Sequence, residues 1–86
     1  MVFEVIDPVD FLTDSRFKQD DFLTKADRFD WAKLKEKRVL VRGCQSDMIP
    51  PWAFMYVTGK LARFAKVVLF GNEHDNVVVF RQSKER

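Results

Sequence analysis

The sequence predicts a small α/β domain, a sheet of three to four strands in two or three layers with one right-handed parallel strand–helix–strand unit. Segments 38–42, 66–70 and 77–82 have the apolar, β-branched composition of strands. The helical segment 49–65 separates the first two strands, and so long a connection favours a parallel crossover. Only a short turn precedes the third strand, which favours an antiparallel hairpin. With 86 residues, the chain is expected to form a single domain over 1–86.

The N-terminal half adds a strand and a helix to this unit. A short strand is expected at 2–6, where β-branched and aromatic residues stop at an Asp-Pro pair. Residues 7–18 are expected to be irregular or to form a helical turn. Segment 19–29 has apolar residues at helical spacing, and Asp20 or Asp21 is expected to cap it.

A second, shorter turn is expected at 31–37, with Asp30 as its cap. Its Trp31 fits either the core or a surface contact. The C-terminal tail carries no apolar residue after the third strand, so its last four residues are expected to be frayed.

The helix at 49–65 carries the signal for an interaction surface. Ser46 or Asp47 is expected to cap it, and prolines are tolerated in its first turn. Its first half is apolar almost all the way round, so we expect helix 19–29 or another chain to cover the side away from the sheet. Gly59 costs the helix about 1 kcal/mol relative to alanine, which indicates that backbone from a strand or second helix approaches closely there.

These features predict a non-enzymatic interaction or assembly protein that acts through an apolar helix surface and uses no cofactor. The candidate interface residues are Trp52, Phe54, Met55, Tyr56 and Gly59. Trp52 is also a candidate for the core, and its place within the apolar helix favours the core. Because so small a domain buries only about 60% of its unfolded surface, we expect a homo-oligomer or a complex with a protein partner.

A second candidate site lies where the parallel strands are expected to end. Cys44 and Asp47 follow the strand at 38–42, and His74 follows the strand at 66–70. Parallel strands of one unit end at the same edge, where α/β folds place ligands. The start of the helix points its free N–H groups at this edge as well.

Three interpretations of this edge stay open. Cys44 can be a thiolate nucleophile whose pKa is lowered by His74 and the helix. Cys44, Asp47 and His74 can instead bind a metal with further ligands from water or another chain. We favour the third interpretation, in which Cys44 ends a buried strand and Asp47 only caps the helix, because no metal or phosphate motif is present. We therefore assign no catalytic and no metal-binding residue.

Composition excludes several classes of protein. The single cysteine excludes an internal disulfide framework, and no apolar run approaches the roughly 20 residues of a membrane helix. The N-terminus lacks a basic region before an apolar one, so we expect a cytoplasmic protein without a signal peptide.

Charge is distributed unevenly along the chain. Residues 1–30 contain eight acids and four bases, whereas 31–86 contain eleven bases and five acids. The bases form no dense cluster, so we do not expect nucleic-acid binding. The bases best placed for such a surface are Lys33, Lys35, Lys37, Arg38, Lys60, Arg63 and Lys66.

The stretch VLVRGCQSDMIPPWAFMYVTGKLARFAKVVLFGN resembles the bacterial domain-of-unknown-function family DUF2480, over roughly residues 3–72. The residues that carry the resemblance are Cys44, Asp47, Ile49, Pro50, Trp52, Ala53, Phe54 and Met55, followed by Lys66, Val67, Val68, Phe70 and Gly71. The resemblance implies a shortened relative of longer proteins that have a further N-terminal strand region and a C-terminal helix. It also suggests a link to iron–sulfur assembly, while the activity of the family is unknown.

Overall fold

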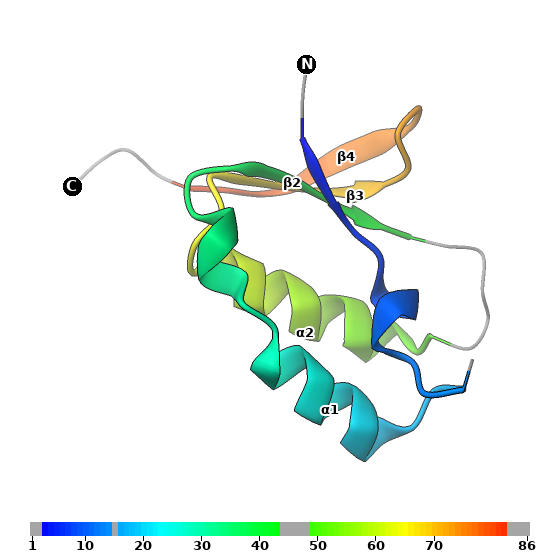
Figure 1. Ribbon diagram of the computed structural model, residues 1–86. Helices are drawn as coiled ribbons and strands as arrows, with labels where there is room; N and C mark the ends of the chain where they lie inside the picture. The colour runs from blue at the N-terminus through cyan, green and yellow to red at the C-terminus, as the bar shows by residue number, and fades with distance from the viewer. Residues whose placement is uncertain (1–2, 15, 44–48, 83–86) are drawn as a thin grey trace.

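A computed structural model describes residues 3–14, 16–43 and 49–82 (Figure 1). Strands, α-helices and short 3-10 helices (η) alternate along the chain. In order they are β1 Glu4–Ile6, η1 Pro8–Phe11, α1 Gln19–Arg28, η2 Trp31–Leu34, β2 Arg38–Arg42, α2 Pro51–Ala62, β3 Val67–Gly71 and β4 Asn76–Arg81. The α/β class predicted from the sequence is confirmed.

The four strands form one mixed sheet in the order β1-β2-β3-β4. β2 and β3 run parallel on either side of the α2 crossover, and β4 returns antiparallel beside β3. This confirms the predicted strand–helix–strand unit and the hairpin. β1 also pairs in parallel with β2, so the chain contains two such units where the sequence indicated one. A strand of only three residues, as β1 is, carries no local signal for its neighbour in the sheet.

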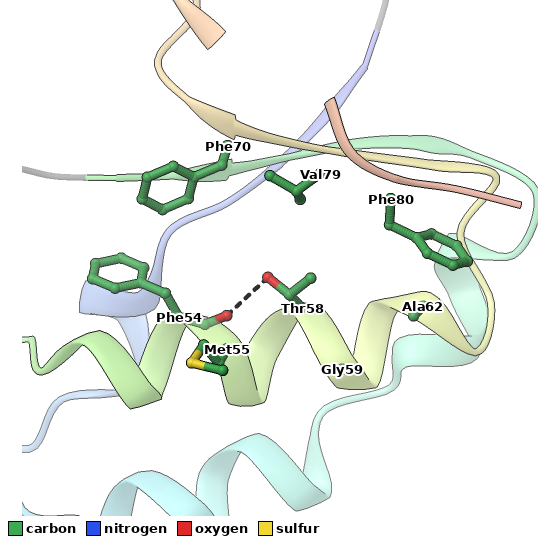
Figure 2. Close-up of a pocket in the computed structure, with 8 residues that line it drawn as sticks. All are labelled: Phe54, Met55, Thr58, Gly59, Ala62, Phe70, Val79 and Phe80. Atoms are coloured by element: carbon green, nitrogen blue, oxygen red, sulfur yellow. Dashed lines mark hydrogen bonds between the residues drawn. The ribbon is translucent and has the colours of Figure 1, made fainter. Parts of the chain in front are cut away.

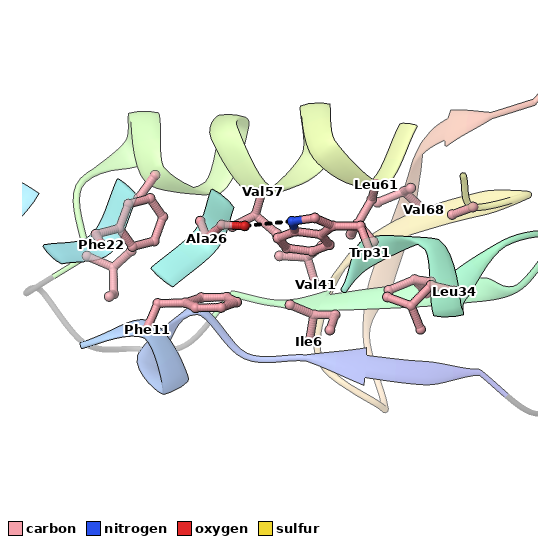
Figure 3. Packing of buried hydrophobic residues seen from close by; sticks show 14 of the residues in the cluster. Ile6, Phe11, Phe22, Ala26, Trp31, Leu34, Val41, Val57, Leu61 and Val68 are labelled. Carbon is pink, nitrogen blue, oxygen red and sulfur yellow. Dashed lines mark hydrogen bonds between the residues drawn. The ribbon is translucent and has the colours of Figure 1, made fainter. Parts of the chain in front are cut away.

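Both α-helices lie on one face of the sheet, and α2 packs on β2 and β3 (Figure 1). The main core fills the space between the helices and the sheet, and side chains from α1, α2 and the sheet meet in it (Figure 3). Its fully buried members include Phe22, Ala26, Val39, Val41, Val57, Leu61 and Val68. The opposite face of the sheet holds a smaller cluster of Leu40, Val67 and Leu69 with Phe3 packed against it. The architecture therefore has two layers.

The aspartate caps differ from those expected. Lys18 occupies the N-cap position of α1, and Asp20 and Asp21 lie in its first turn, where their charge still favours the positive helix end. Asp30 stands at the N-cap of η2, but its side chain makes no capping hydrogen bond. Asp7 instead caps η1, because its Oδ1 accepts from a main-chain N–H of that helix at 3.1 Å.

Helix α2 is shorter than expected at both ends. It begins at Pro51, and Pro50 occupies the N-cap position in an extended conformation. Ser46 and Asp47, the caps expected from the sequence, lie outside the described residues, and so their side-chain contacts stay a prediction. The helix ends at Ala62, because the next residues turn into β3.

Trp31 belongs to the core. Only 5% of its surface is exposed, and its Nε1–H donates to the main-chain oxygen of Ala26 at 2.7 Å (Figure 3). A buried indole needs such a partner to compensate for lost hydration. All nine phenylalanines are likewise buried or half-buried. The exposed apolar surface therefore comes from other residues, above all Met55 of α2 and the valines of β4.

Candidate functional site

An apolar groove of about 450 Å³ runs between α2 and the β3–β4 hairpin (Figure 2). One face of α2 forms its first wall, and the helix-facing side of β3 and β4 forms the second. The lining residues are Phe54, Met55, Thr58, Gly59 and Ala62 from the helix and Phe70, Val79 and Phe80 from the sheet. The space lined by these eight residues is called the groove.

The groove exists because the sheet is wider than the helical layer above it. Helix α2 packs on β2 and β3, which leaves the helix-facing side of β4 without a helix of its own. A β-bulge in β4 then adds Val79 as an extra residue, so that Phe80 lies opposite Val68 and turns toward the helical side. At the other end, the rings of Phe54 and Phe70 meet edge to face with their centroids 5.4 Å apart.

The lining offers apolar contact and almost no polar chemistry. Thr58 is its one polar side chain, and its Oγ1–H donates to the main-chain oxygen of Phe54 at 2.8 Å (Figure 2). None of the eight lining residues titrates. A surface of this kind suits the burial of another apolar group rather than acid–base or nucleophilic catalysis.

The structure divides the five candidate interface residues between two sides of α2. Phe54, Met55 and Gly59 line the groove, and Met55 has 73% of its surface exposed. Trp52 and Tyr56 point instead toward α1. The ring of Trp52 meets Phe17 and Phe22 at centroid distances of 5.5 and 5.7 Å, although 38% of the residue stays exposed.

Tyr56 takes part in a polar contact between the two α-helices. Its hydroxyl donates to Asp27 Oδ1 at 2.5 Å, and Lys60 Nζ lies 2.9 Å from the same oxygen. The hydrogen bond from Tyr56, followed by that from Lys60, lowers the pKa of the Asp27 carboxyl below its usual value. These residues therefore fasten α1 to α2 at an exposed position.

Gly59 has no close neighbour in the described part of this chain. Apart from its chain neighbours and the backbone of its own helix, a Cβ atom built at this position meets no described atom within 4 Å. The expectation that a strand or helix of the same chain approaches its backbone is therefore wrong. Helical periodicity could identify the α2 side of the groove, but the contributions of Phe70, Val79 and Phe80 depend on strand pairing and on the bulge, which have no local signal.

The edge where β2 and β3 end is assembled as expected. The N–H of Gly43 donates to the main-chain oxygen of Gly71 at 2.8 Å, so the segments that follow the two strands start side by side. Cys44 and Asp47 lie outside the described residues. His74 is exposed in the β3–β4 turn, where its N–H donates to Asn72 Oδ1 at 2.8 Å.

The Cys44–Asp47–His74 site thus stays a prediction. Within residues 3–14, 16–43 and 49–82, no three histidine, cysteine, aspartate or glutamate side chains are grouped as a metal site requires.

An ion-pair network that the sequence did not indicate occupies this edge. Arg42, at the end of β2, contacts Asp7 after β1 at 3.5 Å and also pairs with Glu73 after β3. Glu73 raises the pKa of the Arg42 guanidinium, and Arg42 in turn lowers the pKa of Glu73. The network joins the ends of all three parallel strands, which gives it a structural role. It is exposed, so its contribution to stability is small.

Comparison with known proteins identifies a family without an assigned activity. A family model described as "Protein of unknown function (DUF2480)" matches residues 3–84. No curated protein and no solved structure matches the chain. None of the helices in the described ranges combines the length and the apolar character needed to cross a membrane.

Proposed function

This chain belongs to the DUF2480 family of proteins of unknown function, and we propose that it is a non-enzymatic interaction or assembly protein whose groove holds an apolar part of a protein partner. The observation that carries this proposal is the groove itself, an open apolar surface whose one polar side chain is already hydrogen-bonded within α2. Soluble domains seldom leave so continuous an apolar surface in water unless something binds there.

Two residues of the groove are difficult to explain in an isolated chain. Met55 exposes 73% of its surface, and covering a methionine side chain contributes on the order of 1–3 kcal/mol. Methionine also adapts its shape to a partner, because its side chain is unbranched and flexible. Gly59 weakens α2 by about 1 kcal/mol relative to alanine without relieving any contact with the described residues. A partner that packs over Gly59 would cover the Met55 side chain and would use the close approach that a glycine allows.

Site-specific photo-crosslinking tests this proposal. A photoreactive amino acid replaces Met55 in the groove, and in a matched control it replaces Lys35, which is exposed and lies outside the groove. We expect discrete protein adducts from position 55 in cells that make the protein, and only background from position 35. Equal, diffuse labelling at the two positions would contradict a protein-binding groove.

A further inference from the structure

Strand β4 is an exposed edge of the sheet, and the bulge at Val79 is the one feature along it that interrupts a regular ladder. It ends the strand order, and Val77, Val78 and Val79 are 59%, 44% and 49% exposed. Between Asn76 and Phe80 the strand has neither a charge nor a proline, the two residue types that most often block edge-to-edge pairing.

The other edge is protected. Strand β1 has only three residues, starts with a glutamate, and is followed at once by Asp7 and Pro8. An exposed edge with main-chain donors and acceptors free on one side is a template for a further strand. The contrast between the two edges indicates that a further strand would add to the sheet beside β4 and not beside β1.

We propose that the partner is a second copy of this chain, joined by antiparallel pairing of the two β4 strands about a two-fold axis between Val78 and Val79. This inference rests on the proposed function, because the groove lies along β4 and becomes part of the same interface. A two-fold axis requires a surface that is complementary to itself, and β4 meets that requirement in its charges and in its apolar face.

Charge complementarity favours a second copy of this chain over a strand from a different protein. The hairpin turn before β4 carries Asp75, and β4 ends with Arg81; both are exposed, and neither forms an ion pair with another described residue. Pairing about this axis sets Asn76 of one copy opposite Arg81 of the other. The guanidinium then reaches the neighbouring Asp75 of the opposite copy, and symmetry forms this contact twice.

The apolar residues of β4 also match across the axis. Val77 lies opposite Phe70 and Phe80 lies opposite Val68, so both face the helical side of the sheet. The same axis sets Val77 of one copy beside Phe80 of the other. The two grooves then adjoin over one continuous sheet, and each copy covers apolar surface that the other leaves open. Arg81, opposite Val67, turns to the other face and leaves the groove apolar.

Sedimentation equilibrium on the purified chain tests the pairing. At about 50 μM chain we expect mostly dimer, which dissociates on dilution. Val78→Lys places two ammonium groups near the axis, and we expect it to raise the dimer dissociation constant by at least about tenfold. Val5→Lys is the matched control, because Val5 is a similarly exposed valine (37%) on the opposite edge strand. A wild-type monomer at this concentration, or equal effects of both substitutions, would overturn the inference.

Charge reversal separates the proposed pairing from simple loss of folding. Asp75→Arg and Arg81→Asp should each raise the dissociation constant several-fold, while the double variant should return it to within about threefold of wild type. Circular dichroism verifies that each variant is folded. If the double variant does not recover affinity, Asp75 of one copy and Arg81 of the other do not form an ion pair.

Mass spectrometry of the adducts from position 55 distinguishes this inference from the proposed function. Adducts made of this chain alone support both. Adducts with a different protein keep the groove as a protein-binding surface and overturn self-pairing. Absence of any adduct rejects the groove as an interface altogether.

Discussion

The substitutions Gly59→Ala and Gly71→Ala each add one methyl group, the first into open space and the second into a crowded position. Gly59 lies within α2, is exposed, and has open space where its Cβ would be. Gly71 ends β3 with φ +139°, a conformation that L side chains rarely adopt. A Cβ there would collide with the main-chain oxygen of Asp75 and approach Cα of Asn76 to 2.9 Å. We therefore expect Gly59→Ala to stabilise the fold and Gly71→Ala to destabilise it.

The magnitudes follow from these two environments. Gly59→Ala gains the helix propensity of alanine with no steric cost, so the free energy of unfolding should rise by about 1 kcal/mol. Gly71→Ala forces a strained main-chain conformation that costs about 1–3 kcal/mol. The collision with main-chain atoms of the hairpin adds to this cost, because backbone cannot swing aside as a flexible side chain does. We expect a loss of at least about 2 kcal/mol.

Urea denaturation followed by tryptophan fluorescence measures both changes, since Trp31 is buried in the core. All variants are compared at one low chain concentration, because self-association would add to the apparent stability. For a domain of this size, 1 kcal/mol corresponds to a shift in Tm of about 4–8 °C. Wild-type stability in Gly71→Ala would refute the argument about φ, and destabilisation by Gly59→Ala would refute the open space around it.

Four further predictions concern the core, the contact between the helices, the cysteine and the charges. Trp31→Phe should cost about 1–3 kcal/mol in urea denaturation, because the buried oxygen of Ala26 loses its donor; an unchanged midpoint would contradict that hydrogen bond. The pKa of Asp27 is lowered in the fold, so its contribution to stability is present above its usual pKa and is lost as the pH falls through the lowered value. Tyr56→Phe should move the Asp27 pKa back up in a carboxyl NMR titration, whereas an unmoved titration would mean that the hydroxyl bond is not formed in solution. With a purely structural role, Cys44 should alkylate no faster at pH 6 than a free thiol, and elemental analysis should find no bound metal; fast alkylation or a stoichiometric metal would favour the reactive or metal-binding interpretations instead. Binding to nucleic acid should be weak and should fall by about 0.9 log unit in affinity per log unit of salt for each phosphate contact, so tight binding at physiological salt would reverse our ranking of functions.

Much of the fold could be predicted because each strand and helix has a local pattern. The β-branched runs predict the bounds of β2, β3 and β4 to within one residue at each end, and the spacing of apolar residues predicts α1 and most of α2. The length of the α2 crossover and the brevity of the last turn give the parallel and antiparallel pairings. Helix starts are predicted less well, because several aspartates compete for each cap and only main-chain geometry selects among them.

Part of the groove could likewise be predicted from the sequence, and part could not. The apolar run of α2 identifies Phe54 and Met55 as surface candidates, and the cost of a glycine within the helix identifies Gly59. Neither signal separates these residues from Trp52 and Tyr56, which contact α1. Local sequence pattern thus determined which segments are strands and helices and which helix is too apolar to be left uncovered. Only the tertiary structure decided that both helices share one face, that β4 extends beyond them, and that a bulge turns Val79 and Phe80 into the groove. The physical reason is that periodicity is set by neighbours along one segment, whereas a groove is the space left between segments whose distance and register come from pairing and packing across the chain.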